Sequence, residues 1–267
     1  MRVYVRGIGL MGPGLSGWRE SAAILAGLAP YHATEMPRPI PGILPATERR
    51  RSTQAIRLSA QVAQEALKQS QLPASDITTI FASSSGDSEV LHHLCVSLAT
   101  QERFVSPTHF HHSVHNAAAG YWHIAVGSQA SSTSLSSYDA SFCGGLLEAA
   151  VQVCVERSPV MLVAYDTPAP RPLHDARPLT APFGMAIILT GNRMEQTVAQ
   201  LDIHLPGGLT GCATFMDNAE LENLRNGNPA ARGLPLLKAL AITEATALRM
   251  DYLDNSQLHI DVLPCSF

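Results

Sequence analysis

One cysteine near the middle of the chain has a setting that is common for nucleophiles. Residues 138–146 read YDASFCGGL, a pattern typical of a strand end, a tight turn and a helix that opens with small residues. The positive end of a helix dipole stabilises a thiolate and lowers the pKa of a cysteine placed there. Cys143 is therefore a candidate nucleophile. The alternative is an inert cysteine that packs as a small apolar side chain.

Histidines crowd one segment upstream of this cysteine, at His109, His111, His112, His115 and His123. Imidazoles can bind zinc or carry protons. No cysteine or carboxylate lies close enough in the sequence to complete a tetrahedral zinc site, so we predict no metal and interpret these residues as hydrogen-bonded interface histidines. His112 or His115 stays a candidate base for Cys143 in an acyl-thioester hydrolase or acyltransferase.

A glycine pattern near the N-terminus could suggest a cofactor. Residues 7–12 read GIGLMG, which matches the dinucleotide-binding pattern GxGxxG. Pro13 and Gly14 interrupt the expected helix start, and no acidic strand end follows about 20 residues later. We therefore predict a structural glycine turn and no cofactor.

Three consecutive arginines, Arg49, Arg50 and Arg51, form the one local basic spot. They could contact an acidic partner such as an acyl carrier protein, although short charge runs are more often solvated. Residues 83–87, which read SSSGD, could offer backbone N–H groups to an anion or simply cap a helix.

The composition limits the function further. The formal net charge of −4 gives no footprint for nucleic acid, and no apolar run approaches the roughly 20 residues that span a bilayer. Five scattered cysteines without CxxC spacing, and an N-terminus unlike a signal peptide, predict a reduced, cytoplasmic protein. Charged residues make up only 15%, which suggests that a partner covers part of the surface.

Strands and helices must position these groups. We predict strands at 3–6, 79–82, 132–138, 160–164 and 185–189, with helices of about a dozen residues between most of them. This alternation predicts the α/β class, with a mostly parallel sheet covered on both faces. We also predict a loop at 106–112, a helix at 113–126 and a helix at 234–250.

Three strings resemble the N-terminal half of the β-ketoacyl synthases, which are members of the thiolase superfamily. They are residues 3–9 (VYVRGIG), 81–87 (FASSSGD) and, most specifically, 106–122 (SPTHFHHSVHNAAAGYW), which resembles synthase-like proteins of aryl polyene pathways. The resemblance implies a layered α-β-α thiolase-like half-fold, truncated relative to full ketosynthases. We expect one domain over 1–267, with the match in 1–190 and a shortened C-terminal extension in 191–267.

The resemblance also implies that the chain has lost its catalytic groups. Aligning the glycine of the ketosynthase nucleophile turn with Gly145 places Phe142 at the nucleophile position and Cys143 one residue late. One residue turns a helical side chain by about 100°, so Cys143 should not point where the nucleophile points. Chain-length factors, the inactive partners of ketosynthases, resemble this pattern more closely. After Leu189 we find no match to the two histidine motifs of active synthases.

The resemblance therefore implies a non-catalytic chain-length-factor-like subunit that pairs with a full-length β-ketoacyl synthase and serves an acyl carrier protein bearing a polyene chain. The strand with Thr133, Ser134, Leu135 and Ser136 should add edge to edge onto the partner. The segment from Phe110 to Tyr121 should reach the partner's acyl tunnel, and the residues expected near its wall are His112, His115 and Asn116. The open alternatives are a Cys143-dependent acyl-thioester enzyme and a carrier-protein docking module built on Arg49, Arg50 and Arg51.

Overall fold

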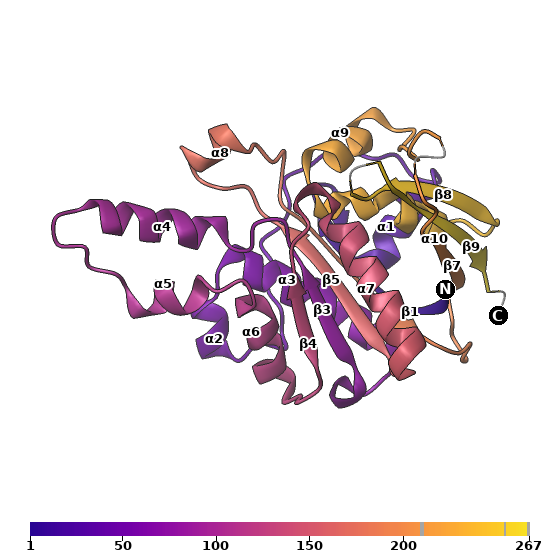
Figure 1. Cartoon of the computed structure of the whole chain (residues 1–267), viewed down its shortest axis with the longest axis horizontal. Coiled ribbons are helices and arrows are strands. Elements are labelled where there is room, and N and C mark those ends of the chain that lie inside the picture. The colour runs from indigo at the N-terminus through magenta and orange to yellow at the C-terminus, as the bar shows by residue number, and fades with distance from the viewer. Residues whose placement is uncertain (209–210, 254, 266–267) are drawn as a thin grey trace.

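The fold is built on one nine-stranded sheet, seen in the computed structural model in Figure 1. The structure describes residues 1–208, 211–253 and 255–265. The strand order is β4-β3-β5-β6-β1-β7-β9-β8, and β2 pairs with β1. The strands are β1 (Arg2–Gly12), β2 (Leu15–Ser16), β3 (Thr78–Ala82), β4 (Ser132–Leu135), β5 (Val160–Asp166), β6 (Phe183–Thr190), β7 (Ala199–His204), β8 (Thr246–Asp251) and β9 (Gln257–Pro264).

Ten α-helices and three short 3-10 turns occupy the described part of the chain. The helices are α1 (Trp18–Leu25), α2 (Ala46–Arg51), α3 (Gln54–Ser70), α4 (Ser88–Ala99), α5 (Pro107–His112), α6 (Ala117–Val126), α7 (Ser141–Glu156), α8 (Leu173–Ala176), α9 (Ala219–Gly227) and α10 (Leu234–Ala241). The turns are η1 (Ala74–Asp76), η2 (Tyr138–Ala140) and η3 (Ala230–Gly233). No helix within the described ranges is long and apolar enough to cross a bilayer.

Helices cover both faces of the sheet, as the α/β class requires. Side chains of α3 and α6 pack with alternate strand residues such as Met161 and Val163 on one face. Side chains of α7 and α10 pack with Leu162 and Ala164 on the other face. Successive strand residues point to opposite faces, so all seven residues of β5 are buried. This layered thiolase-like arrangement confirms the predicted fold class.

The strand directions differ from the expected mostly parallel sheet. β3 pairs in parallel with β4 and with β5, but β5–β6, β6–β1, β1–β7, β7–β9 and β9–β8 are antiparallel. The crossovers through α4–α6 and through α7 are long enough to return the chain for parallel pairing. The connection after β5 contains only the four-residue helix α8, so the chain comes straight back as an antiparallel neighbour.

The expected glycine turn at residues 7–12 is a strand. Gly7 and Gly9 lie inside β1, where a methyl group on Gly9 would overlap the carbonyl oxygen of Val62 on α3, and one on Gly7 would overlap that of Ala66. These glycines therefore let a helix lie directly on the strand, a close approach that any larger residue would prevent.

Two other expected elements are divided differently. The predicted helix at 234–250 ends at Ala241, and Thr246–Asp251 forms the edge strand β8, in which Leu248 and Met250 alternate with exposed residues. Two buried residues separated by one exposed residue fit the period of a strand, not of a helix. The segment 106–112 is largely the helix α5 and not a loop, and the next helix starts at Ala117 instead of residue 113.

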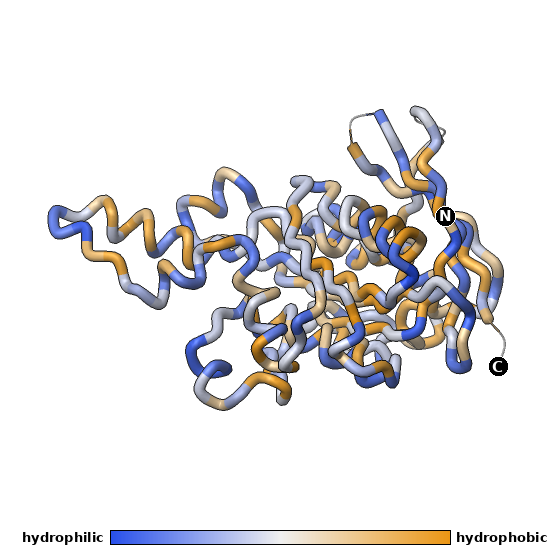
Figure 2. Tube along the Cα trace, turned by 60° about the horizontal axis from the view of Figure 1, so that its bottom comes forward, coloured by the Kyte–Doolittle hydropathy of each residue, from blue (hydrophilic) through white to orange (hydrophobic). Residues whose placement is uncertain are grey.

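Helices α4 and α5 project from the body as a hairpin, which we call the arm (residues 88–112). Figure 1 shows the arm pointing away from the sheet on the side of β4 and α6. In α4 only Ser88 and Val90, in its first turn, are buried. Figure 2 shows that hydrophobic positions recur along the arm as far as its tip. The arm therefore packs little against the rest of the chain.

Candidate functional site

The turn between β4 and α7 is held by the hydroxyl of Ser141. The N–H of Ser137 donates to Ser141 Oγ at 3.0 Å, and that hydroxyl donates to the carbonyl oxygen of Tyr138 at 2.7 Å. Tyr138 has a φ of 53°, a left-handed conformation that is unfavourable for a residue with a side chain. β4 ends at Leu135, so the expected strand at 132–138 stops three residues early and Ser136 lies just beyond it.

Phe142, at the position where the family's nucleophile is expected, lies wholly inside the core. Its side chain is 0% exposed. A methyl group added to Gly233 would meet Phe142 Cε2 at 2.8 Å, and the sulfur of Met185 lies against the same point. The phenyl ring therefore occupies the space at the start of α7 and has no atom that can attack an acyl group.

Cys143 is buried too, and its chemistry is that of the inert alternative. It is 1% exposed, and burial raises the pKa of its thiol to about 12. Burial is the largest cause of this shift, since it removes the water that would stabilise a thiolate, while Arg232 lowers the pKa and Asp251 raises it. The cavity beside it has a volume of only about 10 Å³ and is lined by Thr214, Arg225, Arg232, Pro235, Met250 and Asp251. An acyl thioester has no room to reach the thiol.

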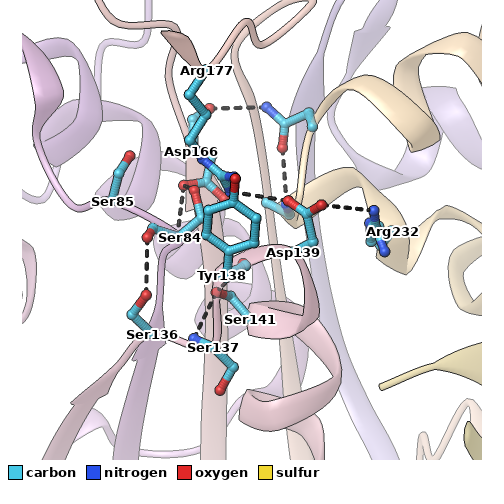
Figure 3. A network of polar contacts seen from close by, with 12 residues as sticks. Ser84, Ser85, Ser136, Ser137, Tyr138, Asp139, Ser141, Asp166, Arg177 and Arg232 are labelled. Atoms are coloured by element: carbon cyan, nitrogen blue, oxygen red, sulfur yellow. Dashed lines mark hydrogen bonds and ion pairs between the residues drawn. The ribbon is translucent and has the colours of Figure 1, made fainter. Parts of the chain in front are cut away.

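A polar network surrounds the same turn, and the sequence analysis missed it. Asp139 accepts hydrogen bonds from Arg177 at 3.0 Å and from Arg232 at 3.2 Å. The guanidinium carbon of Arg177 lies 3.5 Å from the centroid of the Tyr138 ring, a cation–π contact. Figure 3 shows Asp139 between the two arginines, with the Tyr138 ring beside Arg177. Arg177 thus contacts both Asp139 and the exposed ring of Tyr138 in the turn after β4, while Arg232 binds the other oxygen of Asp139.

Asp166 closes strand β5 and anchors the neighbouring serine loop. Its Oδ1 accepts from Ser83 Oγ at 3.0 Å, and from the N–H and Oγ of Ser84, both at 2.8 Å. Its Oδ2 has no hydrogen-bond partner among the described residues. Burial is the largest cause that raises the pKa of Asp166, to about 6, while the hydrogen bonds from Ser84 and Ser83 act the other way. Residues 83–87 therefore bind a carboxylate of the chain itself.

His112 and His115 lie where the arm joins the body, whereas His109 stacks on His93 within the arm and His123 contacts Thr79 Oγ1. His112 is buried, and its Nε2 lies 2.7 Å from the hydroxyl of Tyr121. The Nε2 of His115 lies 3.2 Å from the carbonyl oxygen of Ser83, and Asn116 is exposed just before α6. Phe110 is 68% exposed on the arm. Of the residues expected at the partner's tunnel, Phe110 and Asn116 are accessible, whereas His112 and Tyr121 face each other inside the chain.

Two further expectations concern charges and metals. Arg50 and Arg51 are exposed on α2, near the base of the arm, whereas Arg49 is half-buried and donates to the carbonyl oxygen of Pro41 at 3.3 Å. Within the described ranges, histidine, cysteine and acidic side chains form no group of three that could hold a metal ion.

Sequence and structure comparisons place the chain in a family. The model of the family described as "Beta-ketoacyl synthase, N-terminal domain" matches residues 18–250. No curated protein matches the chain. A structure of a ketosynthase in complex with its chain length factor from Xenorhabdus doucetiae is similar at a TM-score of 0.73 and 20% identity, over 98% of this chain and 99% of that chain.

Two other solved structures have the same fold at lower identity. The AntDE:AntF complex, a type II polyketide synthase acyl-carrier protein with its ketosynthase bound to the hexaketide, has a TM-score of 0.73 and 12% identity, over 99% of each chain. A β-ketoacyl synthase from Burkholderia phymatum has a TM-score of 0.67 and 11% identity, over 99% of this chain and 100% of that chain. Since the family match covers most of the sequence, this chain belongs to the β-ketoacyl synthase N-terminal domain family.

Proposed function

We propose that this chain is a non-catalytic, chain-length-factor-like subunit that pairs with an active β-ketoacyl synthase. The observation that carries the proposal is Phe142, a buried phenyl ring at the position where the family's nucleophile is expected. Cys143 does not replace that nucleophile, because its thiol is buried and its pKa is raised to about 12. Condensation needs a covalent acyl acceptor, so the partner must supply it.

The free edge of β4 supports pairing with a second chain. Among the described residues, β4 hydrogen-bonds to β3 and to no other strand, and it forms one end of the sheet. The N–H of Thr79 donates to Ser131 O, and the N–H of Ser83 donates to Leu135 O. The backbone groups of residues 131 and 135 therefore face β3. Because backbone N–H and C=O groups reverse direction at each successive residue of a strand, those of Ser134 point away from β3. An outward-facing edge is a template for adding a strand of another chain.

The arm supports the same conclusion from a different surface. It carries several large apolar side chains that are about half-exposed or more: Leu91, Val96, Leu98, Phe104 and Phe110. The arm and the β4 edge lie on the same side of the molecule (Figure 1). A continuous surface with an open strand edge and exposed apolar groups is typical of a permanent interface, which buries about 2,000 Å² or more.

The pathway and the substrate are the finer part of the proposal. The segment 106–122 resembles proteins of aryl polyene pathways, and one similar structure is described as a ketosynthase in complex with its chain length factor. We propose that this chain serves aryl polyene biosynthesis, where it would shape the tunnel for an acyl chain carried by an acyl carrier protein. Arg50 and Arg51, exposed near the base of the arm, are the candidate contacts with that acidic carrier.

Co-expression with a related full-length ketosynthase tests the pairing. We expect a one-to-one complex by native mass. Replacing Ser134 by proline removes an outward N–H without removing a bond to β3, so this variant should lose the complex and keep its own fold. Ala247→Pro is the matched control on the opposite edge. The neighbouring Arg249 bonds outward to Thr214, so the N–H of Ala247, two residues away, also points outward. A chain that stays monomeric beside the ketosynthase would contradict the proposal.

Carrier binding is tested separately on the assembled complex. The double variant Arg50→Glu and Arg51→Glu should weaken carrier binding, with Arg171→Glu, an exposed arginine on another segment, as the control. Equal binding by both variants would show that α2 does not contact the carrier.

A further inference from the structure

The arm is rich in imidazole and poor in charge. Residues 88–112 contain only three charged side chains, Glu89, Glu102 and Arg103. The same segment contains five of the chain's 11 histidines, His92, His93, His109, His111 and His112, and His115 follows it closely. Because an ordinary imidazole titrates near pH 6.5, a segment of this composition gains positive charge as the pH falls from 7.5 to 5.5.

Several of these imidazoles contact each other and join the two helices of the arm. The rings of His93 on α4 and His109 on α5 stack with centroids 5.3 Å apart and planes 17° apart. The ring of His92 lies 5.8 Å from that of His93, and the ring of His111 lies 5.7 Å from that of His112. Stacked neutral rings attract each other, whereas two imidazolium ions at this separation repel.

At the base of the arm, His112 connects α5 to α6 through Tyr121. It is 2% exposed, and its Nε2 lies 2.7 Å from the Tyr121 hydroxyl. Burial and the neighbouring His111 and His109 lower the pKa of His112, and Asp87 and Glu48 act in the opposite direction. Neutral imidazole is thus the form that this packing favours at physiological pH.

The acidic groups near the arm are too few to offset the charge of its histidines when these are protonated. Asp87 and Glu48 are the carboxylates that act on His112. Burial and the neighbouring Arg38 lower the pKa of Arg57, and Glu89 acts in the opposite direction, so part of the charge of Glu89 is balanced by that guanidinium. Glu102 and Arg103 are adjacent in the loop between α4 and α5 and carry opposite charges. Protonation would therefore leave the arm with a net positive charge next to its exposed apolar side chains.

We propose that the arm is a proton-sensitive docking element, which enters an apolar groove of the partner subunit with its imidazoles neutral and is released when they are protonated. The identity of the partner rests on the proposed function. The apolar side chains provide the contact area, and the imidazoles make that area compatible with an apolar groove only while they are uncharged. Each imidazole that must stay neutral takes up one proton from solvent on release.

The expected size of the effect follows from this proton uptake. For an imidazole that titrates near pH 6.5, a requirement for neutrality weakens binding by about tenfold between pH 7.5 and 5.5. The stacked pair His93 and His109 supplies two imidazoles that an apolar groove would have to receive in the neutral form. We therefore expect the complex with the ketosynthase to be about 100-fold weaker at pH 5.5 than at pH 7.5.

The test compares dissociation constants of the complex at pH 7.5, 6.5 and 5.5 for three forms of this chain. The double variant H93Q/H109Q keeps polar side chains that cannot titrate, and it should recover most of the affinity lost at pH 5.5. The control H32Q removes an exposed histidine outside the arm and should behave like the wild type. A partner that titrates on its own affects all three forms equally, so the difference between them isolates the arm. Equal pH dependence in all three forms overturns the inference.

A second measurement separates this inference from the proposed function. Hydrogen exchange of the purified chain should show faster exchange in residues 88–112 at pH 5.5 than at 7.5, after correction for intrinsic rates. Exchange in α3 and in the sheet should be unchanged. If no complex with a ketosynthase forms at any pH, the proposed function fails. If the complex forms normally but hydrogen exchange of the arm does not depend on pH, only the proton-sensitive arm is contradicted.

Discussion

Replacing Phe142 by alanine measures how firmly the phenyl ring fills the position where the family's nucleophile is expected. The ring is 0% exposed and packs against Gly233 and Met185. Truncation of a fully buried phenylalanine costs about 3–5 kcal/mol, because the transfer free energy is lost and a cavity remains. A domain of this kind has a free energy of unfolding of about 5–15 kcal/mol, so the variant should stay folded with a much smaller margin.

Equilibrium unfolding in urea, followed by circular dichroism, gives the difference in free energy directly. Phe110→Ala is the matched control, because that phenylalanine is 68% exposed and its truncation should change stability by about 0.5 kcal/mol or less. Phe142→Leu, which retains most of the volume, should cost about 1.5 kcal/mol. If Phe142→Ala cost less than about 1 kcal/mol, the ring would not be tightly packed, and the argument that it occupies the acyl-attack position would be refuted.

Three further predictions follow from burial, charge and close packing. Iodoacetamide at pH 8 should label Cys95, which is exposed, and leave Cys143 unmodified in the native protein, because burial raises the Cys143 pKa to about 12; labelling of both would contradict its burial. The pKa of Asp166 is raised from 3.8 to about 6, so ionisation of this carboxyl is less favourable in the folded state. Stability should therefore fall by roughly 2–3 kcal/mol as pH rises from about 4 to 6. This loss of stability, measured as the shift of the urea midpoint with pH, should vanish in Asp166→Asn. Gly9→Ala should destabilise the folded protein by several kcal/mol, because the added methyl group overlaps Val62. Gly120→Ala in α6, with open space around it, should stabilise the folded protein by about 0.5–1 kcal/mol. Similar thermal midpoints for the two variants would be inconsistent with the packing of α3 on β1.

Local pattern predicted much of the fold. The buried strand β5 is an unbroken apolar run, which was expected at 160–164 and is observed at Val160–Asp166. The length of β1 was predicted too short, because Gly7 and Gly9 are typical of turns. The role of these glycines depends on a helix more than 50 residues away in the sequence. The direction of β6 depends on the length of the preceding connection, which strand patterns do not contain.

The candidate site was only partly predictable for the same reason. The alignment on Gly145 drew attention to Phe142 and Cys143, whose burial is a consequence of their place at the start of α7. The network of Asp139 with Arg177 and Arg232 joins residues 38 and 93 positions apart, and no local pattern indicates such contacts. Asp166 did leave a trace in the sequence, since it ends an otherwise apolar strand. A carboxylate at that place usually has a partner inside the fold.

The central place of β1 affects the order in which the sheet can form during synthesis. Tyr4 pairs with Thr190 on β6 and with Gln200 on β7, so during synthesis β1 waits for partners almost 200 residues later in the chain. Contacts of such sequence separation slow folding and prolong the exposure of unpaired strands. The parallel unit of β3, β4 and β5 is complete by residue 166, well before β1 can be enclosed. A nascent chain should therefore first assemble the part with the open β4 edge, and its N-terminal strand should be among the last elements to gain protection.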